Sequence, residues 1–242
     1  MANNKLWFFP RTEGIIIGTG ILIVLELVIH FIYINALEAQ KGEIFEGLHR
    51  TGMVISTLLD EEKHQLLVAR EQEDSLEYLK QLEPLKRVID SDSTIEFVYT
   101  MIQKKAKNGE NEIFFILDPT PPGLDANNDS IEDKSHLMEQ YLSPSKELIE
   151  AFKTKEITIS EEVYHDQWGG HIRVYLPFFD KSGLFVGVLG LDISATTYQE
   201  RLAPIRKATL RAMITTLFIS YLCGLAIWFL RNFCFRIYKS NS

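Results

Sequence analysis

Several aromatic side chains of this chain could stack on a small organic molecule. Tyr99, Phe115, Trp168, Tyr175 and Phe178 lie in or beside segments whose composition is typical of β-strands. Aromatic residues are also common in strands for packing reasons alone, so a place in a sheet core is the alternative interpretation for each of them.

Two charged residues stand among these aromatic ones. Arg173 alternates with Tyr175 on one face of a strand, where it could hold a carboxylate through two parallel hydrogen bonds or pair with a surface acid, which is the simpler interpretation. Asp192 follows an apolar run at a strand end, where a buried carboxylate must be paired or bound to a donor. Capping of a helix from Ser194 onward is the equal alternative for Asp192.

An Asx-rich loop carries a partial calcium pattern. Asp125, Asn127 and Asp129 match the first, third and fifth positions of a calcium loop, but Ser130 replaces the expected Gly and His136 the expected bidentate Glu. An ordinary loop is therefore the default interpretation. We find no zinc spacing, nucleophile elbow or phosphate-binding loop, so we expect neither a cofactor nor an enzyme.

Two nearly pure apolar segments flank the part that carries these residues. Segments 15–34 and 208–230 both suit helices that cross a bilayer, which needs about 20 apolar residues. A signal peptide cut near residues 35–39 is the alternative for the first segment, although its apolar stretch is longer than the usual 7–15 residues.

The short tails predict the orientation of these segments. Tail 1–14 carries Lys5 and Arg11 against Glu13, and tail 231–242 carries two Arg and one Lys and no acid. Because positive tails stay in the cytoplasm, we expect a two-pass protein of the plasma (inner) membrane with residues 36–207 outside.

Glu26 and His30 lie four residues apart, on one face of the first apolar helix. A carboxyl group in hydrocarbon usually faces protein, so its partner could be Glu26 of a twin chain, or Arg211 if the depths match. The three residues are thus candidates for a signalling contact, with simple adhesion between helices as the alternative.

The segment between the two apolar blocks is acidic. All but two of the 33 Asp and Glu residues lie between residues 36 and 205, which argues against nucleic-acid binding. Residues 36–90 read as a helical leader, with helices over 36–59 and about 60–82 and an interruption at Pro84. Such a stalk commonly pairs with a twin, so we expect a homodimer.

Residues 91–205 read as an α+β domain with an antiparallel sheet. Strands are predicted at 95–103, 112–117, 157–160, 170–179 and 184–193, with a helix over 145–152. A loop covers 118–133, and residues 180–183 join the last two strands as a hairpin.

The order of these elements and several motifs resemble the PAS-like Cache (PDC) sensor domains of bacterial transmembrane receptors. The segment 164–180 (YHDQWGGHIRVYLPFFD) resembles that family's acidic-Trp-Gly turn and aromatic strand, and 183–194 (GLFVGVLGLDIS) its final Gly-x-x-Gly-x-Asp-Ile strand. Segments 97–100 (FVYT) and 114–118 (FFILD) resemble its first two strands. The resemblance covers about residues 36–200 and implies a PAS-like antiparallel sheet with a long N-terminal helix.

The resemblance also implies a function. It gives Asp192 a place facing a ligand pocket, and it implies ligand sensing coupled to a cytoplasmic output such as a histidine kinase, a cyclase or a chemotaxis domain. The Arg-x-Trp spacing of the amino-acid-binding members is absent, so an amino-acid ligand is not supported. We therefore expect a membrane-anchored sensor of a small organic ligand whose output lies in a missing portion or a partner protein. A membrane scaffold whose outer domain binds another protein is the alternative.

Overall fold

The computed structural model describes residues 9–107, 109–125, 130–160 and 162–240. The chain forms two compact units, Gly42–Arg201 and the pair of stretches Met1–Lys41 and Leu202–Ser242. Two long helices, α1 (Pro10–Leu58) and α5 (Ala195–Ser240), contribute to both units.

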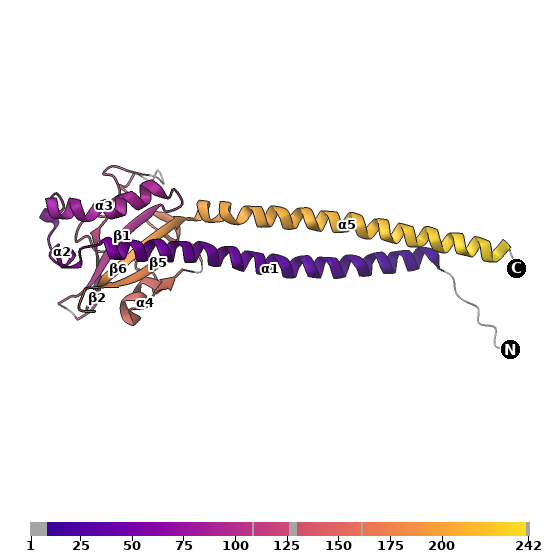
Figure 1. Cartoon of the computed structure of the whole chain (residues 1–242), viewed down its shortest axis with the longest axis horizontal. Helices are drawn as coiled ribbons and strands as arrows, with labels where there is room; N and C mark the ends of the chain where they lie inside the picture. Colours follow the sequence, from indigo (N-terminus) through magenta and orange to yellow (C-terminus); the bar gives the residue numbers. More distant parts are fainter. Residues whose placement is uncertain (1–8, 108, 126–129, 161, 241–242) are drawn as a thin grey trace. The chain divides into compact units, whose positions relative to one another are not determined.

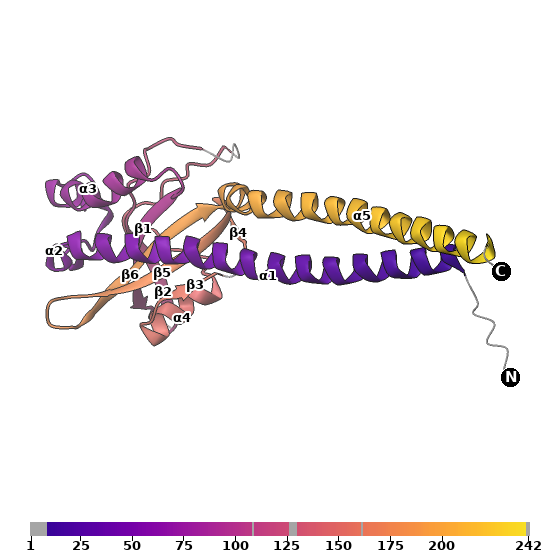
Figure 2. The ribbon, with the colours of Figure 1, turned by 45° about the vertical axis from the view of Figure 1, so that its right-hand side comes forward.

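In the smaller unit, the N-terminal stretch of α1 lies alongside the C-terminal stretch of α5 (Figures 1 and 2). Gly14 and Gly224 permit the close approach, because a Cβ atom added at Gly14 would lie 2.7 Å from the Gly224 carbonyl oxygen. Both helices are long and apolar enough to cross a membrane, and only 6% of each apolar stretch is buried in the molecule. A core helix of a soluble protein would instead be mostly buried.

The larger unit is built on an antiparallel sheet (Figure 2). Its strands follow the spatial order β2-β1-β6-β5-β3, and β4 also pairs with β5. Their bounds are β1 (Phe97–Lys105), β2 (Asn111–Leu117), β3 (Thr158–Ile159), β4 (Tyr164–Asp166), β5 (Gly169–Phe179) and β6 (Phe185–Ser194). The α+β class, the PAS-like antiparallel sheet and the long N-terminal helix are confirmed.

A helix packs on each face of this sheet. The last third of α1 lies on one face, where a Cβ atom added at Gly52 would come within 3 Å of the Leu176 side chain. Helix α4 (Lys146–Thr154) packs on the other through Leu148 and Phe152. Because side chains alternate along a strand, residues 173 and 175 of β5 share the α4 face, and residue 176 lies on the α1 face.

The predicted single helix over 60–82 is wrong. The structure has α2 (Glu61–Gln65), a 3-10 turn η1 (Arg70–Gln72) and α3 (Leu76–Ser91). The side-chain amide of Gln72 ends α2. Its oxygen accepts hydrogen bonds from the backbone N–H groups of residues 68 and 69, and its nitrogen donates to the Leu66 carbonyl. Pro84 does not interrupt α3, which continues past it with Leu82 and Leu85 buried.

Candidate functional site: the Arg173 cage

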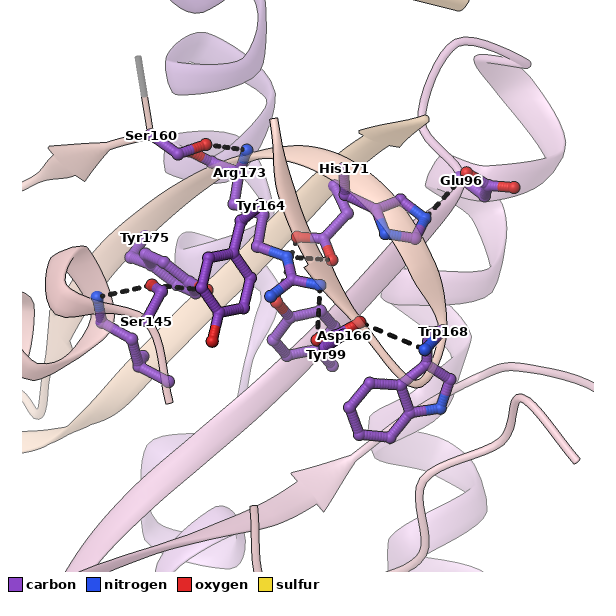
Figure 3. A network of polar contacts seen from close by, with 12 residues as sticks. Glu96, Tyr99, Ser145, Ser160, Tyr164, Asp166, Trp168, His171, Arg173 and Tyr175 are labelled. Atoms are coloured by element: carbon purple, nitrogen blue, oxygen red, sulfur yellow. Dashed lines mark hydrogen bonds and ion pairs between the residues drawn. The ribbon is translucent and has the colours of Figure 1, made fainter. Parts of the chain in front are cut away.

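The central feature of the α4 face is a buried guanidinium held by two carboxylates (Figure 3). Arg173 Nη2 lies 2.7 Å from Asp166 Oδ2, and Arg173 Nε lies 3.2 Å from Asp192 Oδ2. Arg173 and Asp192 are directly opposite each other on β5 and β6, while Asp166 ends β4. All three side chains are 2–3% exposed, so the ion pairs are almost completely removed from water.

Two tyrosine hydroxyls complete the polar cluster. Tyr141 Oη accepts a hydrogen bond from Arg173 Nη1 at 3.0 Å and donates to Asp166 Oδ2 at 2.7 Å. Tyr99 Oη donates to Asp192 Oδ1 at 3.0 Å. Gly190 makes room for the Tyr99 ring, because a Cβ atom at position 190 would lie 2.3 Å from that ring.

Burial dominates the ionisation of this cluster. It raises the pKa of Asp192 above its ordinary value, although the neighbouring Arg173 acts in the opposite direction. Burial also raises the pKa of Tyr99 and Tyr141, so both hydroxyls stay protonated and can donate. Burial alone would lower the pKa of Arg173, but the charge of Asp192 raises it, so Arg173 remains a cation.

A tight turn between β4 and β5 places Trp168 in an aromatic wall of the cavity that the cluster lines. The backbone N–H of Trp168 donates to Asp166 Oδ1 at 3.1 Å, and Gly169 follows with φ +109°, a conformation that favours glycine. The Trp168 ring lies 5.5 Å from the Phe115 ring and 5.6 Å from the Tyr141 ring. We call the group of side chains around the guanidinium the Arg173 cage; it comprises Tyr99, Phe115, Tyr141, Asp166, Trp168, Arg173 and Asp192.

The cage encloses very little empty space. Its cavity measures about 20 Å³, which is room for about one water molecule and for no organic ligand. The side chains of the cage fill nearly all of the space between them.

The structure brings five of the six predicted ligand-binding residues to this cavity, namely Tyr99, Phe115, Trp168, Arg173 and Asp192. Tyr175 does not line it. Its side chain is fully buried in the adjoining core, its Oη lies 3.4 Å from Ser145 Oγ, and burial raises its pKa to about 12.

The structure distinguishes between the alternative roles considered for Arg173 and Asp192. Arg173 pairs with acids, but these are buried rather than on the surface. Asp192 does not cap the following helix. Ser194 does so, because its Oγ accepts from the backbone N–H of Thr197 at 3.2 Å.

Sequence reasoning missed Tyr141 and Asp166 as members of this cluster. Tyr141 lies in an irregular segment between Asp133 and Ser145, where no periodicity assigns it a face. Asp166 belongs to a strand of three residues that was not predicted. Its place before the Trp-Gly turn was the one available signal, since an Asx side chain there commonly accepts from the turn backbone.

The weak calcium pattern gains no support within the described residues. Asn127 and Asp129 lie outside the described residues, and Asp125 Oδ2 accepts a hydrogen bond from the Ser130 backbone N–H at 2.9 Å. Among the described residues, no three His, Cys, Asp or Glu side chains are grouped to hold a metal.

The apolar helices contain a separate polar contact. Glu26 Oε1 accepts a hydrogen bond from Thr216 Oγ1 at 2.6 Å, so the partner in this chain is Thr216, and Arg211 does not line the same groove. Glu26 and His30 share a groove of about 370 Å³ with Tyr33 and Arg206. Glu13 and Arg231 form an ion pair in the same unit, with Arg231 Nη2 2.9 Å from Glu13 Oε1.

No protein-family model matches the chain, and no curated protein matches it. Among solved structures, the ligand-binding domain of the Campylobacter jejuni chemoreceptor Tlp3 in complex with L-valine is similar, with a TM-score of 0.45 and 17% identity over 82% of this chain and 68% of that chain.

Two further structures show the same kind of likeness. The periplasmic sensory domain of the Campylobacter jejuni chemoreceptor Tlp1 has a TM-score of 0.42 and 14% identity over 67% of this chain and 58% of that chain. A structure described as methyl-accepting chemotaxis protein X has a TM-score of 0.39 and 13% identity over 71% and 65%. The function proposed below therefore rests on this chain's own residues.

Proposed function

We propose that this chain is a membrane-anchored extracytoplasmic sensor that binds a small organic ligand at the Arg173 cage. The observation that carries the proposal is the buried cluster of Asp166, Arg173 and Asp192 in a cavity that also has an aromatic wall. Perturbed ionisable groups gathered in one cavity are candidates for a functional site.

A purely structural role explains this cluster poorly. Well-packed apolar residues in place of a buried ion pair often leave stability unchanged or improve it, so such a cluster is weak evidence for a stabilising role. Aromatic rings around fixed charges are, by contrast, what a ligand site needs for orientation and affinity.

The cage lies close in sequence to the helix that would transmit a signal. Asp192 is three residues before Ala195, where α5 begins, and α5 continues without a break to Ser240. A ligand that alters the Asp192 contacts would shift the start of α5, provided that it binds one of two arrangements more tightly than the other. We propose that α5 carries this change across the membrane to a cytoplasmic output domain, in a homodimer.

A thermal-shift experiment on the full chain in detergent tests the proposal. The library contains organic acids, amines, nucleobases and divalent ions, and a ligand at 100 times its Kd should add about 2.7 kcal/mol of stability. A hit should disappear in Trp168→Ala and persist in Phe179→Ala, which removes an aromatic ring that is 40% exposed and outside the cage. A hit that is indifferent to Trp168→Ala would place the binding elsewhere.

The second candidate function is a scaffold whose outer domain binds another protein. The cavity of about 20 Å³ favours it, because a site for a drug-sized ligand usually measures 300–1,000 Å³. The absence of any hit from a well-folded sample would support this alternative over the sensor.

A further inference from the structure

Each nitrogen of the Arg173 guanidinium already faces a group of the protein. Its Nη1 donates to Tyr141, its Nη2 to Asp166, and its Nε faces Asp192. A ligand carboxylate would have to compete with two buried carboxylates that are already in place, which disfavours the carboxylate clamp, one of the two roles that the sequence left open for Arg173.

The charge of the cavity wall also disfavours an anion. Four carboxyl groups line the cavity, those of Asp118, Asp133, Asp166 and Asp192, and Arg173 is the sole Lys or Arg among its described lining residues. Burial raises the pKa of Asp118 and Asp192, which reflects the cost of keeping these carboxylates charged and away from water. Added positive charge would lower that cost.

The aromatic wall has the composition of a cation site. The ring centroids of Phe115, Tyr141 and Trp168 lie 5.5–5.6 Å from one another, and these side chains line the same cavity as the carboxylates. The faces of aromatic rings attract ammonium and guanidinium groups, and such rings form the recognition sites of quaternary ammonium ligands.

The contact from Arg173 to Asp192 has poorer hydrogen-bond geometry than the contact from Arg173 to Asp166. Arg173 Nε lies 3.2 Å from the carboxylate, but this contact lacks the geometry of a hydrogen bond and leaves Nε buried without a hydrogen-bond partner in the described structure. The contact to Asp166, in comparison, is a well-formed hydrogen bond of 2.7 Å. Asp192 is therefore the carboxylate that another cation can most readily take over.

We infer that the cage selects a small organic cation, an amine or a guanidine, and that Arg173 is an internal cation that occupies the site until the ligand displaces it from Asp192. This inference rests on the proposed function of the cage as a ligand site. It explains why an aromatic and acidic site has a cavity of only about 20 Å³. It also makes Arg173 an autoinhibitory residue, since each ligand must first pay for its displacement.

The test uses two variants of the full chain, Arg173→Ala and Arg173→Ala/Asp166→Asn. The double variant removes one positive and one negative charge. N-ethylguanidinium is the probe that matches the atoms lost in Arg173→Ala. Benzylammonium, benzyl alcohol and benzoate form a second set that shares a ring and differs in charge. Binding is measured as the shift of the melting temperature with probe concentration.

We expect N-ethylguanidinium and benzylammonium to stabilise both variants, and the wild type to bind benzylammonium at least about tenfold more weakly, because Arg173 competes. Asp192→Asn, added to either variant, should abolish the effect. If Arg173→Ala does not fold without a cation, the charge-balanced double variant gives the same comparison.

Equal binding of benzyl alcohol or benzoate would overturn the cation preference, and equal affinity of wild type and variants would overturn the displacement. A neutral or anionic library hit that Trp168→Ala abolishes would refute this inference and leave the proposed function standing. A third outcome is that N-ethylguanidinium stabilises the variants while no library compound stabilises the wild type. This outcome would support the cation preference and count against the proposed sensor function.

Discussion

At the scale of single residues, the stability of the cage depends on side chains that form hydrogen bonds with one another in place of water. Tyr141 Oη is both an acceptor for Arg173 and a donor to Asp166, so its removal leaves two buried charged groups each short of a hydrogen bond. Hydrogen bonds to charged groups contribute about 1.5–3 kcal/mol when buried.

Tyr141→Phe should therefore destabilise the larger unit by about 2 kcal/mol, which lowers its melting temperature by about 5 °C. Tyr164→Phe is the matched control, because the Tyr164 hydroxyl donates to the Ser143 carbonyl at an exposed site. The measurement is thermal unfolding followed by near-ultraviolet circular dichroism. Equal melting temperatures for the two variants would show that the Tyr141 bridge contributes nothing.

His64 predicts a pH dependence. It is 1% exposed, its Nε2 lies 2.8 Å from Thr100 Oγ1, and burial lowers its pKa from 6.5 to about 4. Because the folded pKa lies below the unfolded one, the unfolded chain binds the proton more tightly. Stability from His64 is thus complete above about pH 6.5 and declines as the pH falls to about 4, by about 3 kcal/mol in all.

His64→Asn should remove most of this dependence, so that its melting temperature falls less than that of the wild type between pH 7 and pH 5. His165→Asn, at an exposed position, should leave the wild-type dependence unchanged. If the melting temperature of His64→Asn fell as much as that of the wild type between pH 7 and pH 5, His64 would not be the source of the pH dependence.

Individual residues show how much of this site can be predicted from the sequence. The two-residue period of a strand places Arg173 on one face, and the apolar run before Asp192 indicates a buried carboxylate. Neither pattern identifies the partners of these charges. Tyr141 is 32 positions before Arg173, and only the folded sheet brings the two together.

At the scale of elements, α1 contains glycines in two contrasting environments. Gly52 faces the sheet, where an added Cβ atom would approach two Leu176 methyl carbons at 2.6 and 2.8 Å and one of Leu191 at 3.0 Å. Gly47, one and a half turns earlier in α1, has no atom within 4 Å of such a Cβ.

Gly52→Ala should destabilise the larger unit by about 1–3 kcal/mol through overpacking, whereas Gly47→Ala should stabilise it by about 0.5–1 kcal/mol through helix propensity. Thermal unfolding of the two single variants provides the comparison. A rise in melting temperature for both would show that α1 does not pack closely on β5 and β6.

The same scale shows where periodicity misleads. Apolar spacing between residues 60 and 82 favours one helix, but the Gln72 side chain satisfies backbone groups that would otherwise continue it. One amide outweighs the pattern because it bonds three backbone groups at once. The strand β4 was missed for a related reason, since three residues are too few to establish a two-residue period.

At the scale of the whole molecule, charge is divided between the segments. Acidic residues concentrate between residues 36 and 205, while the tail after residue 230 carries Arg231, Arg236 and Lys239 without an acid. We therefore expect the acidic segment outside and both tails in the cytoplasm.

Cysteine labelling of intact cells tests this topology. Both native cysteines, Cys223 and Cys234, are free thiols. In a Cys223→Ala background, Lys181→Cys places a thiol on the exposed turn between β5 and β6. A membrane-impermeant maleimide should label this thiol in intact cells, whereas Cys234 should react only after permeabilisation, because it follows the second apolar segment on the cytoplasmic side. Labelling of Cys234 in intact cells would reverse the orientation, and it would expose the Arg173 cage to cytoplasmic amines instead of external ones.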